Sequence, residues 1–435
     1  MKAKKIGVVG AGYIGTIIAC ILAEQGFEIM AVDINENRVS DLENKKLRIS
    51  ELGLEEIFKR NFNKIKFSSN FELLKDSQVI IVAVGTPLGE DSNADLTGIE
   101  QAARKLGNVI CKNTLICIKS TVVPGTCEKF GNEIEQISDL KMGQDFFLAY
   151  TPERLAKGKA IEEFKSFPIL VGSDDQTSSY LAKEFWESAT GNIVIQLSSF
   201  KAAELTKLAD NLWVDVNVAL ANSISLVAHE YNLDSDEVID AANSLPKGDG
   251  KVNILRSSIG VGGSCLKKDS IFFANIMDSI NLDPSLIRSA RNFNDNMPYE
   301  YCNVIEEWVE SNKISAPKVS MIGLSFKSDT DDLSYTPMVD VYKRLKKSFT
   351  VKIFDPIVSP KDFGKKLGDK IKYSNFIDCF DDANVIVFGC AHSEIKHEDI
   401  VKNIKTLNKK FIIVDGRGGY PELKSILPKE NYIKI

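Results

Sequence analysis

Short apolar runs alternate with helical patterns along the first 200 residues of the chain. The runs are rich in β-branched and aromatic residues, and the stretches between them carry apolar residues at helical spacing. This alternation predicts an α/β fold of the doubly wound type, in which helices cover both faces of a parallel sheet. The runs are Ile6–Val9, Phe27–Val32, Val79–Val84, Thr114–Ile118, Phe146–Ala149 and Ile169–Val171.

A second series of apolar runs begins near residue 318 and predicts a second α/β unit. Its members are Val319–Ile322, Val351–Phe354, Val385–Phe388 and Phe411–Val414. We therefore expect an N-terminal Rossmann-like domain over 1–197, a central helical domain over 198–312 and a C-terminal Rossmann-like domain over 313–435.

The segment between the two series predicts one long helix. Phe200–Asn232 contains no Gly or Pro and carries apolar residues at helical spacing, which predicts about eight or nine turns. A helix of this length can join two domains, and its surplus of apolar residues predicts a homodimer interface. Asn243–Gly263, with Pro246 and five glycines, predicts an irregular loop.

Composition and charge exclude several classes of protein. Lys and Arg number 54 against 60 Asp and Glu, so the net charge is −6, and we find no basic patch for nucleic acid. The apolar runs are much shorter than the roughly 20 residues of a membrane-spanning helix, so we expect no membrane insertion. Eight cysteines lie singly without metal-ligand spacing, which predicts no metal site and a reducing cytoplasm.

A glycine-rich segment, Gly10-Ala11-Gly12-Tyr13-Ile14-Gly15, follows the first predicted strand and precedes a helical pattern. Asp33 follows the second strand, 18 residues beyond Gly15. In this context the glycines let a pyrophosphate approach the helix N-terminus, and the acid would accept hydrogen bonds from ribose hydroxyls. Because a carboxylate repels a 2′-phosphate, we predict NAD rather than NADP. The alternative is a glycine turn that only packs strand on helix.

Cys265 is the one cysteine with a reactive context. It lies in Gly262-Gly263-Ser264-Cys265-Leu266-Lys267-Lys268-Asp269, where glycines admit a substrate and lysines favour a thiolate nucleophile. The alternative is an inert core cysteine.

Two polar patterns have both a functional and a structural interpretation. Glu204, Lys207, Asn211 and Asp215 recur at spacings of three and four on the predicted long helix, a pattern usually typical of a solvated face. Lys207 and Asn211 could instead stabilise an oxyanion. Glu153 follows a predicted strand end, where it could act as a general base or make a salt bridge or helix cap.

Several short motifs together resemble the UDP-glucose/GDP-mannose dehydrogenase family, the nucleotide-sugar 6-dehydrogenases, over nearly the whole chain. Beside the glycine fingerprint, they are Val84-Gly85-Thr86-Pro87 with Asp95-Leu96, Lys119-Ser120-Thr121-Val122, Thr151-Pro152-Glu153-Arg154, Lys207-Leu208-Ala209-Asp210-Asn211, Gly262-Gly263-Ser264-Cys265 with Lys268-Asp269, Ser325-Phe326-Lys327 with Asp331-Asp332 and Pro337, and Asp415-Gly416-Arg417.

The resemblance implies a four-electron oxidation of the sugar C6 alcohol to a carboxylate by two NAD⁺. It assigns catalysis to Cys265, Lys207, Asn211, Glu153, Thr121 and Asp269. It assigns cofactor binding to Gly10, Gly12, Tyr13, Ile14, Gly15, Asp33, Arg38, Gly85, Thr86, Pro87 and Thr121. It assigns UDP-sugar binding to Arg154, Leu155, Lys207, Asn211, Gly262, Gly263, Lys268, Phe326, Lys327 and Arg417.

The motifs do not agree on the sugar. The Pro152-Glu153-Arg154 version, with Lys157 where a second glutamate is usual, resembles the branch that oxidises UDP-N-acetylhexosamines, whereas Ser264 and Lys268 resemble the UDP-glucose branch. Ser334 stands where the family commonly has an arginine, which puts one substrate or intersubunit contact in doubt.

We therefore predict a UDP-N-acetylhexosamine dehydrogenase, such as one for UDP-N-acetylmannosamine, with UDP-glucose as the first alternative. A non-catalytic nucleotide-sugar or NAD-binding protein is the second. The third is a 6-phosphogluconate-like or hydroxyacid dehydrogenase, which performs one oxidation and needs no thiol.

Overall fold

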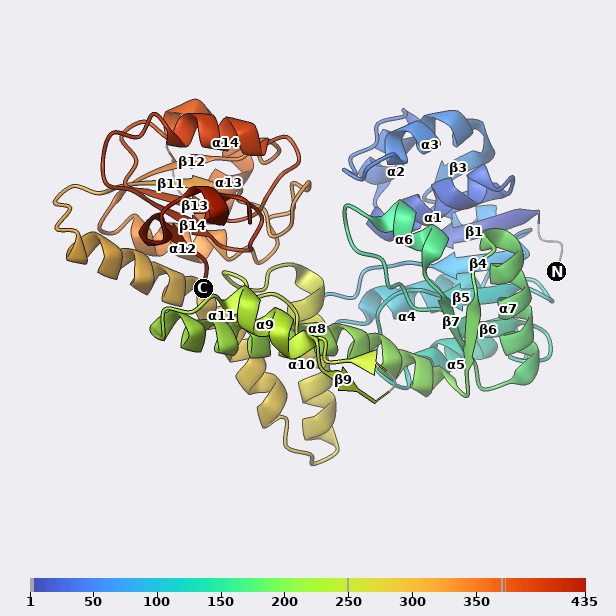
Figure 1. Cartoon of the computed structure of the whole chain (residues 1–435). Helices are drawn as coiled ribbons and strands as arrows, with labels where there is room; N and C mark the ends of the chain where they lie inside the picture. The colour runs from blue at the N-terminus through green and yellow to red at the C-terminus, as the bar shows by residue number, and fades with distance from the viewer. Residues whose placement is uncertain (1–3, 249, 369–370, 372) are drawn as a thin grey trace. The chain divides into compact units, whose positions relative to one another are not determined.

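The computed structural model describes residues 4–248, 250–368, 371 and 373–435. They form two compact units, residues 1–210 and 211–435, and each unit is described by itself (Figure 1). The three-part division at 197/198 and 312/313 remains a prediction.

An eight-stranded sheet forms the centre of the first unit. Its order is β3-β2-β1-β4-β5-β6-β7-β8, which contains the strand order of dinucleotide-binding folds. The strands are β1 (Lys5–Val9), β2 (Glu28–Val32), β3 (Ile65–Ser68), β4 (Val79–Val82), β5 (Leu115–Ile118), β6 (Phe147–Tyr150), β7 (Ile169–Gly172) and β8 (Val194–Leu197).

All six predicted strands of this unit are confirmed, and β3 and β8 are additional. The expectation of a wholly parallel sheet is wrong at one edge, because β6 and β7 pair antiparallel through Tyr150 and Gly172. β8 then pairs parallel with β7, so the last two strands run against the other six.

Helices cover both faces of this sheet, as predicted (Figure 1). Side chains of α1, α3 and α7 pack in the core on one face, and those of α4, α5 and the start of α8 pack on the other. The helices are α1 (Tyr13–Glu24), α2 (Glu36–Glu43), α3 (Leu54–Asn61), α4 (Thr97–Gly107), α5 (Thr126–Ser138), α6 (Ala160–Ser166), α7 (Gln176–Thr190) and α8 (Phe200–Glu230).

The second unit contains a parallel five-stranded sheet of order β12-β11-β13-β14-β15. The strands are β11 (Lys318–Ile322), β12 (Thr350–Phe354), β13 (Val385–Phe388), β14 (Ile412–Asp415) and β15 (Tyr432–Ile433), of which the first four confirm the second apolar series. The helices after α8 are α9 (Ser235–Asn243), α10 (Ser264–Ser279), α11 (Ser285–Ser311), α12 (Met338–Leu345), α13 (Pro360–Leu367), α14 (His397–Ile404) and α15 (Leu423–Ile426).

Each sheet has a point where the strand order changes direction: between β1 and β4 in the first unit and between β11 and β13 in the second. The loops that leave neighbouring strands in opposite directions open a crevice at such a point, and ligands of open α/β sheets bind there. The carboxyl ends of these strands are therefore the places to look for chemistry.

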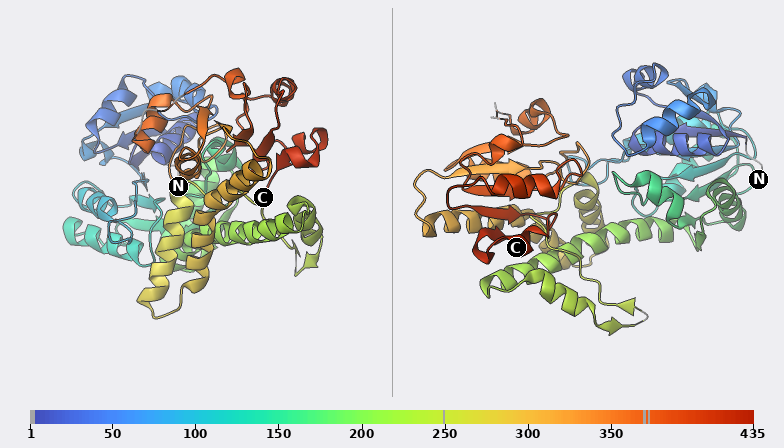
Figure 2. Two further views of the ribbon diagram at one scale, coloured as in Figure 1. Left: turned by 90° about the vertical axis from the view of Figure 1, so that its left-hand side faces the viewer. Right: turned by 45° about the horizontal axis from the view of Figure 1, so that its top comes forward.

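The long predicted helix is confirmed as α8, which runs without a break over 31 residues (Figure 2). Among the described residues it alone is long and apolar enough to cross a bilayer, a test that core helices of soluble proteins also pass. The predicted loop Asn243–Gly263 contains a short hairpin, β9 (Pro246–Lys247) and β10 (Gly250–Lys251), and is otherwise irregular where it is described.

Candidate active site

The glycine turn after β1 has the geometry of a phosphate cradle. Gly10 has a φ of +94°, and a Cβ on Gly15 would lie 1.7 Å from the Gly10 carbonyl oxygen, so neither position accepts a side chain. Nothing lies within 4 Å of a Cβ built on Gly12, so this glycine faces open space at the N-terminus of α1. The residues present therefore fit a dinucleotide pyrophosphate.

A cavity of about 200 Å³ lies beside this turn, where β1 and β4 diverge. Its lining includes Gly10, Gly12 and Asp33 from the first two strand ends, and Val84 and Gly85 after β4. The predicted cofactor residues that follow β1, β2 and β4 thus come together. Thr86, one residue further, donates a hydrogen bond of 2.6 Å from its hydroxyl to the Thr121 carbonyl oxygen, so the Thr121 loop is tied to the same edge.

Asp33 is buried, and its carboxylate accepts three hydrogen bonds. The donors are the amide of Ala11 at 2.8 Å, the amide of Asn35 at 2.9 Å and the guanidinium of Arg38 at 2.8 Å. A carboxylate has about four acceptor positions, so one remains for a ribose hydroxyl. Arg38 is half exposed and pairs with the acid, which places both predicted cofactor residues at the cavity wall.

Glu153 lies just beyond the end of β6 and is held by its neighbours. One carboxylate oxygen accepts hydrogen bonds from the amides of Arg154 and Leu155, and the other lies 3.5 Å from the Lys119 ammonium without a hydrogen bond. Lys119 also donates to the Thr151 carbonyl oxygen and lies 4.9 Å from the ring centroid of the buried Trp186. A largely buried carboxylate with one uncommitted oxygen can accept a proton from a water molecule.

The neighbouring Arg154 is already paired within the first unit. Its guanidinium contacts both carboxylate oxygens of Asp210 on α8, at 2.8 and 3.5 Å. The Leu155 side chain packs against the core of the sheet. Both residues were predicted to bind substrate. Their backbone amides already donate to Glu153, so this arrangement leaves the remaining guanidinium donors of Arg154 for that role.

The polar stripe of α8 is not a solvated face. Glu204, Lys207 and Asp215 are buried, so that alternative is wrong for these three side chains. Glu204 accepts hydrogen bonds from the amides of Gly125 and Cys127 at the start of α5, at 2.7 and 2.8 Å. Burial raises the pKa of Glu204, although these amide donors oppose the shift.

Asp215 is the centre of a buried cluster in the second unit. It accepts hydrogen bonds from Ser270 at 2.8 Å and Asn294 at 2.9 Å, and it pairs with the Arg291 guanidinium at 2.5 Å. Ser270 belongs to α10, and Arg291 and Asn294 belong to α11. The cluster therefore fixes α8 against the helix that carries Cys265.

Cys265 occupies the first turn of α10 and is exposed. Unpaired backbone N–H groups and the helix dipole at this position stabilise negative charge on a thiolate or an oxyanion. Asp269, one turn further along the same helix, accepts a hydrogen bond from the Asn211 amide and lies 2.8 Å from the Lys268 ammonium. Two predicted site residues, Lys268 and Asp269, thus lie within one helical turn of Cys265, and the hydrogen bond to Asp269 brings Asn211 of α8 to the same turn.

The loop before Cys265 is held against the strand ends of the second sheet. A Cβ on Gly263 would lie 2.8 Å from the Phe326 ring, and one on Gly262 would lie 2.5 Å from Phe326 Cβ, so only glycine permits this contact. The Gly263 amide donates to the Ser334 carbonyl oxygen at 2.8 Å. The backbone of residue 334 therefore holds the cysteine loop. This contact does not depend on the side chain, so it is present although a serine stands where the family commonly has an arginine.

Arg417 also contacts this loop, donating to the Gly260 carbonyl oxygen at 3.2 Å. Its Nε is buried without a hydrogen bond, and burial lowers the pKa of the guanidinium. Among the described residues no carboxylate forms an ion pair with it. A half-buried guanidinium that has no acidic partner among these residues suits an anionic ligand such as a pyrophosphate. Lys327 follows Phe326 in the same strand-end loop, and its carbonyl oxygen accepts hydrogen bonds from Ser325 and Thr330.

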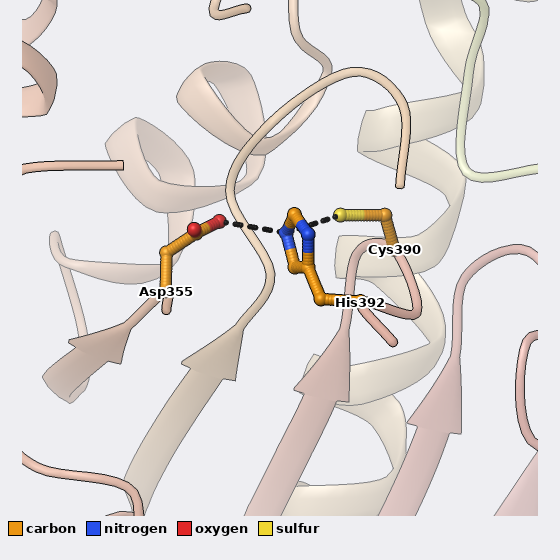
Figure 3. A group of neighbouring side chains, drawn as sticks. All are labelled: Asp355, Cys390 and His392. Carbon is orange, nitrogen blue, oxygen red and sulfur yellow. Dashed lines mark hydrogen bonds and ion pairs between the residues drawn. The ribbon is translucent and has the colours of Figure 1, made fainter. Parts of the chain in front are cut away.

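A buried Asp–His–Cys cluster lies where β11 and β13 diverge (Figure 3). The His392 Nε2 lies 3.1 Å from Asp355 and 3.2 Å from the Cys390 sulfur, a donor set that zinc accepts. However, the Asp329 amide donates to Nδ1 at 3.0 Å, so the ring carries its proton on Nε2 and donates to Asp355. A metal on Nε2 would need that proton on Nδ1, facing an N–H group. The residues fit a hydrogen-bonded cluster better than a metal site.

Three regions of the chain match the domains of one protein family. The NAD binding domain of the UDP-glucose/GDP-mannose dehydrogenase family matches residues 4–190, the central domain matches 201–296 and the UDP binding domain matches 320–422. The chain belongs to this family. It is an NAD-dependent UDP-sugar dehydrogenase.

Similar UDP-sugar dehydrogenases cover nearly the whole chain. UDP-N-acetyl-D-mannosamine dehydrogenase of Pyrococcus horikoshii is 31% identical over 418 residues, which are 95% of each chain. A solved structure of UDP-D-ManNAc dehydrogenase from P. horikoshii has a TM-score of 0.83 at 30% identity and covers 95% of both chains. A UDP-glucose dehydrogenase structure from Pyrobaculum islandicum has a TM-score of 0.82 at 26% identity and covers 95% of this chain and 94% of that one. Fold similarity therefore does not separate the two sugars.

Sequence reasoning did not single out the residues that hold the site residues in place. Lys119 and Asp210 stand inside motifs that carry the family resemblance, so their position was a usable signal. Glu51, Arg291 and His392 had no such signal, because their partners are distant along the chain.

Proposed function

We propose that this UDP-sugar dehydrogenase oxidises a UDP-N-acetylhexosamine, with UDP-N-acetylmannosamine as the first candidate, to the corresponding uronic acid. The Pro152-Glu153-Arg154 segment and the name of the P. horikoshii relative support this sugar. The Arg154–Asp210 pair adds a structural reason, because it gives the arginine of that segment a fixed position in the first unit.

The proposed reaction consumes one sugar, two NAD⁺ and one water. Loss of a hydride and a proton from the C6 alcohol gives an aldehyde, and the Cys265 thiolate adds to its carbonyl carbon. Loss of the second hydride turns this thiohemiacetal into a thioester. Water then adds to the thioester carbonyl, the carbon–sulfur bond breaks, and carboxylate, thiolate and protons are released. NAD⁺ supplies the hydride acceptor in both oxidations.

The other site residues act on these steps through charge and hydrogen bonds. Lys207 and Asn211, one turn apart on α8, stabilise the oxyanions. Glu153 accepts the proton of the attacking water, and Thr121 and Asp269 hold a water molecule. Lys268, Lys327 and Arg417 bind the substrate, the last two through its pyrophosphate.

The observation that carries the proposal is the Asn211–Asp269 hydrogen bond within one helical turn of the exposed Cys265. A protein that only binds nucleotide sugars has no physical need for a thiol beside such a pair. UDP-glucose remains the second candidate, because Ser264 and Lys268 resemble that branch.

Counting NADH per sugar tests the proposal. Purified protein is mixed with NAD⁺ and, separately, with UDP-N-acetylmannosamine, UDP-N-acetylglucosamine and UDP-glucose. The proposal is supported if UDP-N-acetylmannosamine gives two NADH per sugar and UDP-glucose reacts most slowly of the three. One NADH per substrate would favour a single oxidation, and a preference for UDP-glucose would move the assignment to the alternative.

The Cys265→Ala variant separates catalysis from binding. We expect uronic acid formation to fall by about a thousandfold or more, since the thioester cannot form, while NAD⁺ and UDP-sugar still bind in calorimetry. Cys111→Ala, at another exposed cysteine, is the matched control and should keep full activity. Unchanged acid formation by Cys265→Ala would overturn the cysteine mechanism.

We also propose a cytoplasmic homodimer that forms through α8. Trp213, Leu220 and Val227 are exposed at seven-residue spacing along one side of this helix. Such an apolar stripe is stable in water when a second copy covers it. A monomeric mass at micromolar concentration would contradict the dimer, and Leu220→Glu should shift a dimer toward monomer.

A further inference from the structure

Glu51 joins two segments of the first unit that are distant along the chain. It lies in the connection between α2 and α3, outside every motif of the sequence. One carboxylate oxygen accepts hydrogen bonds from the Tyr13 hydroxyl and from the Gly158 amide, at 2.7 Å for the amide. The other oxygen accepts from the Ala160 amide at 2.8 Å.

The first of these segments is the dinucleotide turn itself. Tyr13 follows Gly12 and is the first residue of α1, where the backbone would meet the cofactor pyrophosphate. Burial, together with the hydrogen bond to Glu51, raises the pKa of the Tyr13 phenol, so it remains a hydrogen-bond donor.

The second segment is the loop that follows Glu153, Arg154 and Leu155. Besides the two amides held by Glu51, the amide of Ala156 donates to Glu163 at 2.6 Å. The ammonium of Lys157 lies 5.3 Å from the centroid of the Tyr13 ring. Glu51 and Glu163 already bring two carboxylates to this cluster, and the positive charge of Lys157 offsets them, whereas a glutamate at position 157 would add to their repulsion.

We propose that Tyr13 and Glu51 transmit occupancy of the dinucleotide turn to the loop at residues 156–160. The cofactor fixes the backbone at Gly12 and Tyr13, the phenol fixes the Glu51 carboxylate, and the carboxylate fixes two loop amides. Glu51 is then a positioning residue, and sugar binding at Arg154 and Leu155 is favoured once the cofactor is bound. The link to sugar binding rests on the proposed function, whereas the link from cofactor to loop does not.

Hydrogen exchange tests the link without any sugar. Amide exchange of a peptide covering 154–163 is measured by mass spectrometry in the full chain, with and without saturating NAD⁺. In the native protein we expect NAD⁺ to slow exchange of the Gly158 and Ala160 amides by about fivefold. In Glu51→Gln this slowing should be lost while NAD⁺, checked by calorimetry, still binds. Tyr13→Phe changes a predicted cofactor residue, so it is compared at an NAD⁺ concentration that saturates it in calorimetry, and it should lose the slowing too.

Two control variants separate this coupling from a general loosening of the loop. Glu163→Gln removes a different carboxylate that holds the same loop, so exchange without NAD⁺ should rise but the slowing by NAD⁺ should remain. Tyr180→Phe alters an exposed tyrosine on α7 and should change neither.

Two results would overturn the proposal: no slowing by NAD⁺ in the native protein, or equal slowing in native protein, Tyr13→Phe and Glu51→Gln. A failure of the proposed sugar assignment would leave these exchange data unaffected and would show in the NADH count instead. Once a substrate is known, Glu51→Gln should raise KM for the sugar more than it lowers kcat, whereas loss of stability alone would lower active enzyme and leave KM unchanged.

Discussion

The two sheets of this dehydrogenase build the same turn twice and use it differently. In the first unit the Asp33 carboxylate follows β2 and accepts the Ala11 amide at 2.8 Å. In the second, Asp355 follows β12 and accepts the Leu324 amide at 2.6 Å. The backbone agrees as well, because Gly10 donates to the carbonyl oxygen at the end of β2 and Gly323 to that at the end of β12, at 2.8 and 3.0 Å.

The difference lies in what fills the crevice beside the turn. Between β1 and β4, glycines leave a cavity, and the side chain beside Asp33 is the half-exposed Arg38. Between β11 and β13, the side chains of Cys390 and His392 occupy the corresponding place (Figure 3). Ser325 contacts both, and the Asp355 side chain has no exposed surface. One aspartate can therefore meet a ligand, and the other holds its unit together.

The largest expected difference is in stability. Asp355→Asn should lower the free energy of unfolding by about 3 kcal/mol, because every group around this carboxylate is a donor and an amide N–H₂ must face one of them. Asp33→Asn should cost less, about 1 kcal/mol, since the half-exposed Arg38 can turn toward water and the new N–H₂ group then faces a single backbone amide at the edge of a cavity. Chemical denaturation of both variants measures these two losses in the free energy of unfolding. Equal losses would remove the distinction between the two aspartates.

The Gly12→Val variant should bind NAD⁺ more weakly and keep the stability of the native protein. The Cβ of a valine there meets no protein atom within 4 Å, and the side chain enters the space in front of α1, so the Kd for NAD⁺ should rise by roughly tenfold to hundredfold. Gly250→Val, also in open space but in the second unit, is the control and should bind normally. Calorimetry measures the Kd for NAD⁺, and the midpoint of thermal unfolding without cofactor measures stability. A large fall in this midpoint for Gly12→Val would contradict the prediction.

Discrimination between cofactors should depend on Asp33. In Asp33→Ser the guanidinium of Arg38 loses its acidic partner and can meet a 2′-phosphate. We expect the ratio of kcat/KM for NADP⁺ to that for NAD⁺ to rise about tenfold, whereas Asp76→Ser at an exposed ion pair should leave it unchanged. An unchanged ratio would show that Asp33 does not exclude the phosphate.

The smallest expected effect is a difference in acid stability between the units. Burial raises the pKa of Asp355, but hydrogen bonds from His392 and from the Leu324 and Val358 amides outweigh burial and leave the pKa below its usual value. The ionised Asp355 carboxylate therefore stabilises the folded protein at any pH above the ordinary aspartate pKa of about 4. This stabilisation is lost as the pH falls from there through the lowered pKa of Asp355. The pKa of Glu204 in the first unit is raised, so folding favours its protonated form. Its contribution to stability is therefore retained at low pH. Hydrogen exchange between pH 3 and pH 5 should show the second unit opening first.

Much of this comparison could be predicted from local patterns, and some could not. Apolar runs located ten strands and α8, because burial in a sheet or helix imposes a period on the chain itself. β3 and β8 are short and partly exposed, and the reversed direction of β7 leaves no mark on composition. The stripe on α8 was ambiguous for a related reason, since the partners of Glu204 lie 77 and 79 residues away and spacing within one helix cannot reveal them.

The environment of Lys119 also gives the enzyme an optical property. The ammonium that approaches Glu153 lies over the indole of Trp186, a ring with no exposed surface. Emission from a buried indole depends on the electric field across it, and here a charge 4.9 Å from the ring centroid belongs to the ion pair with Glu153, the proposed general base. Of the three tryptophans, Trp186 is therefore the one whose emission should respond to events at Glu153, and this part of the intrinsic fluorescence needs no added label.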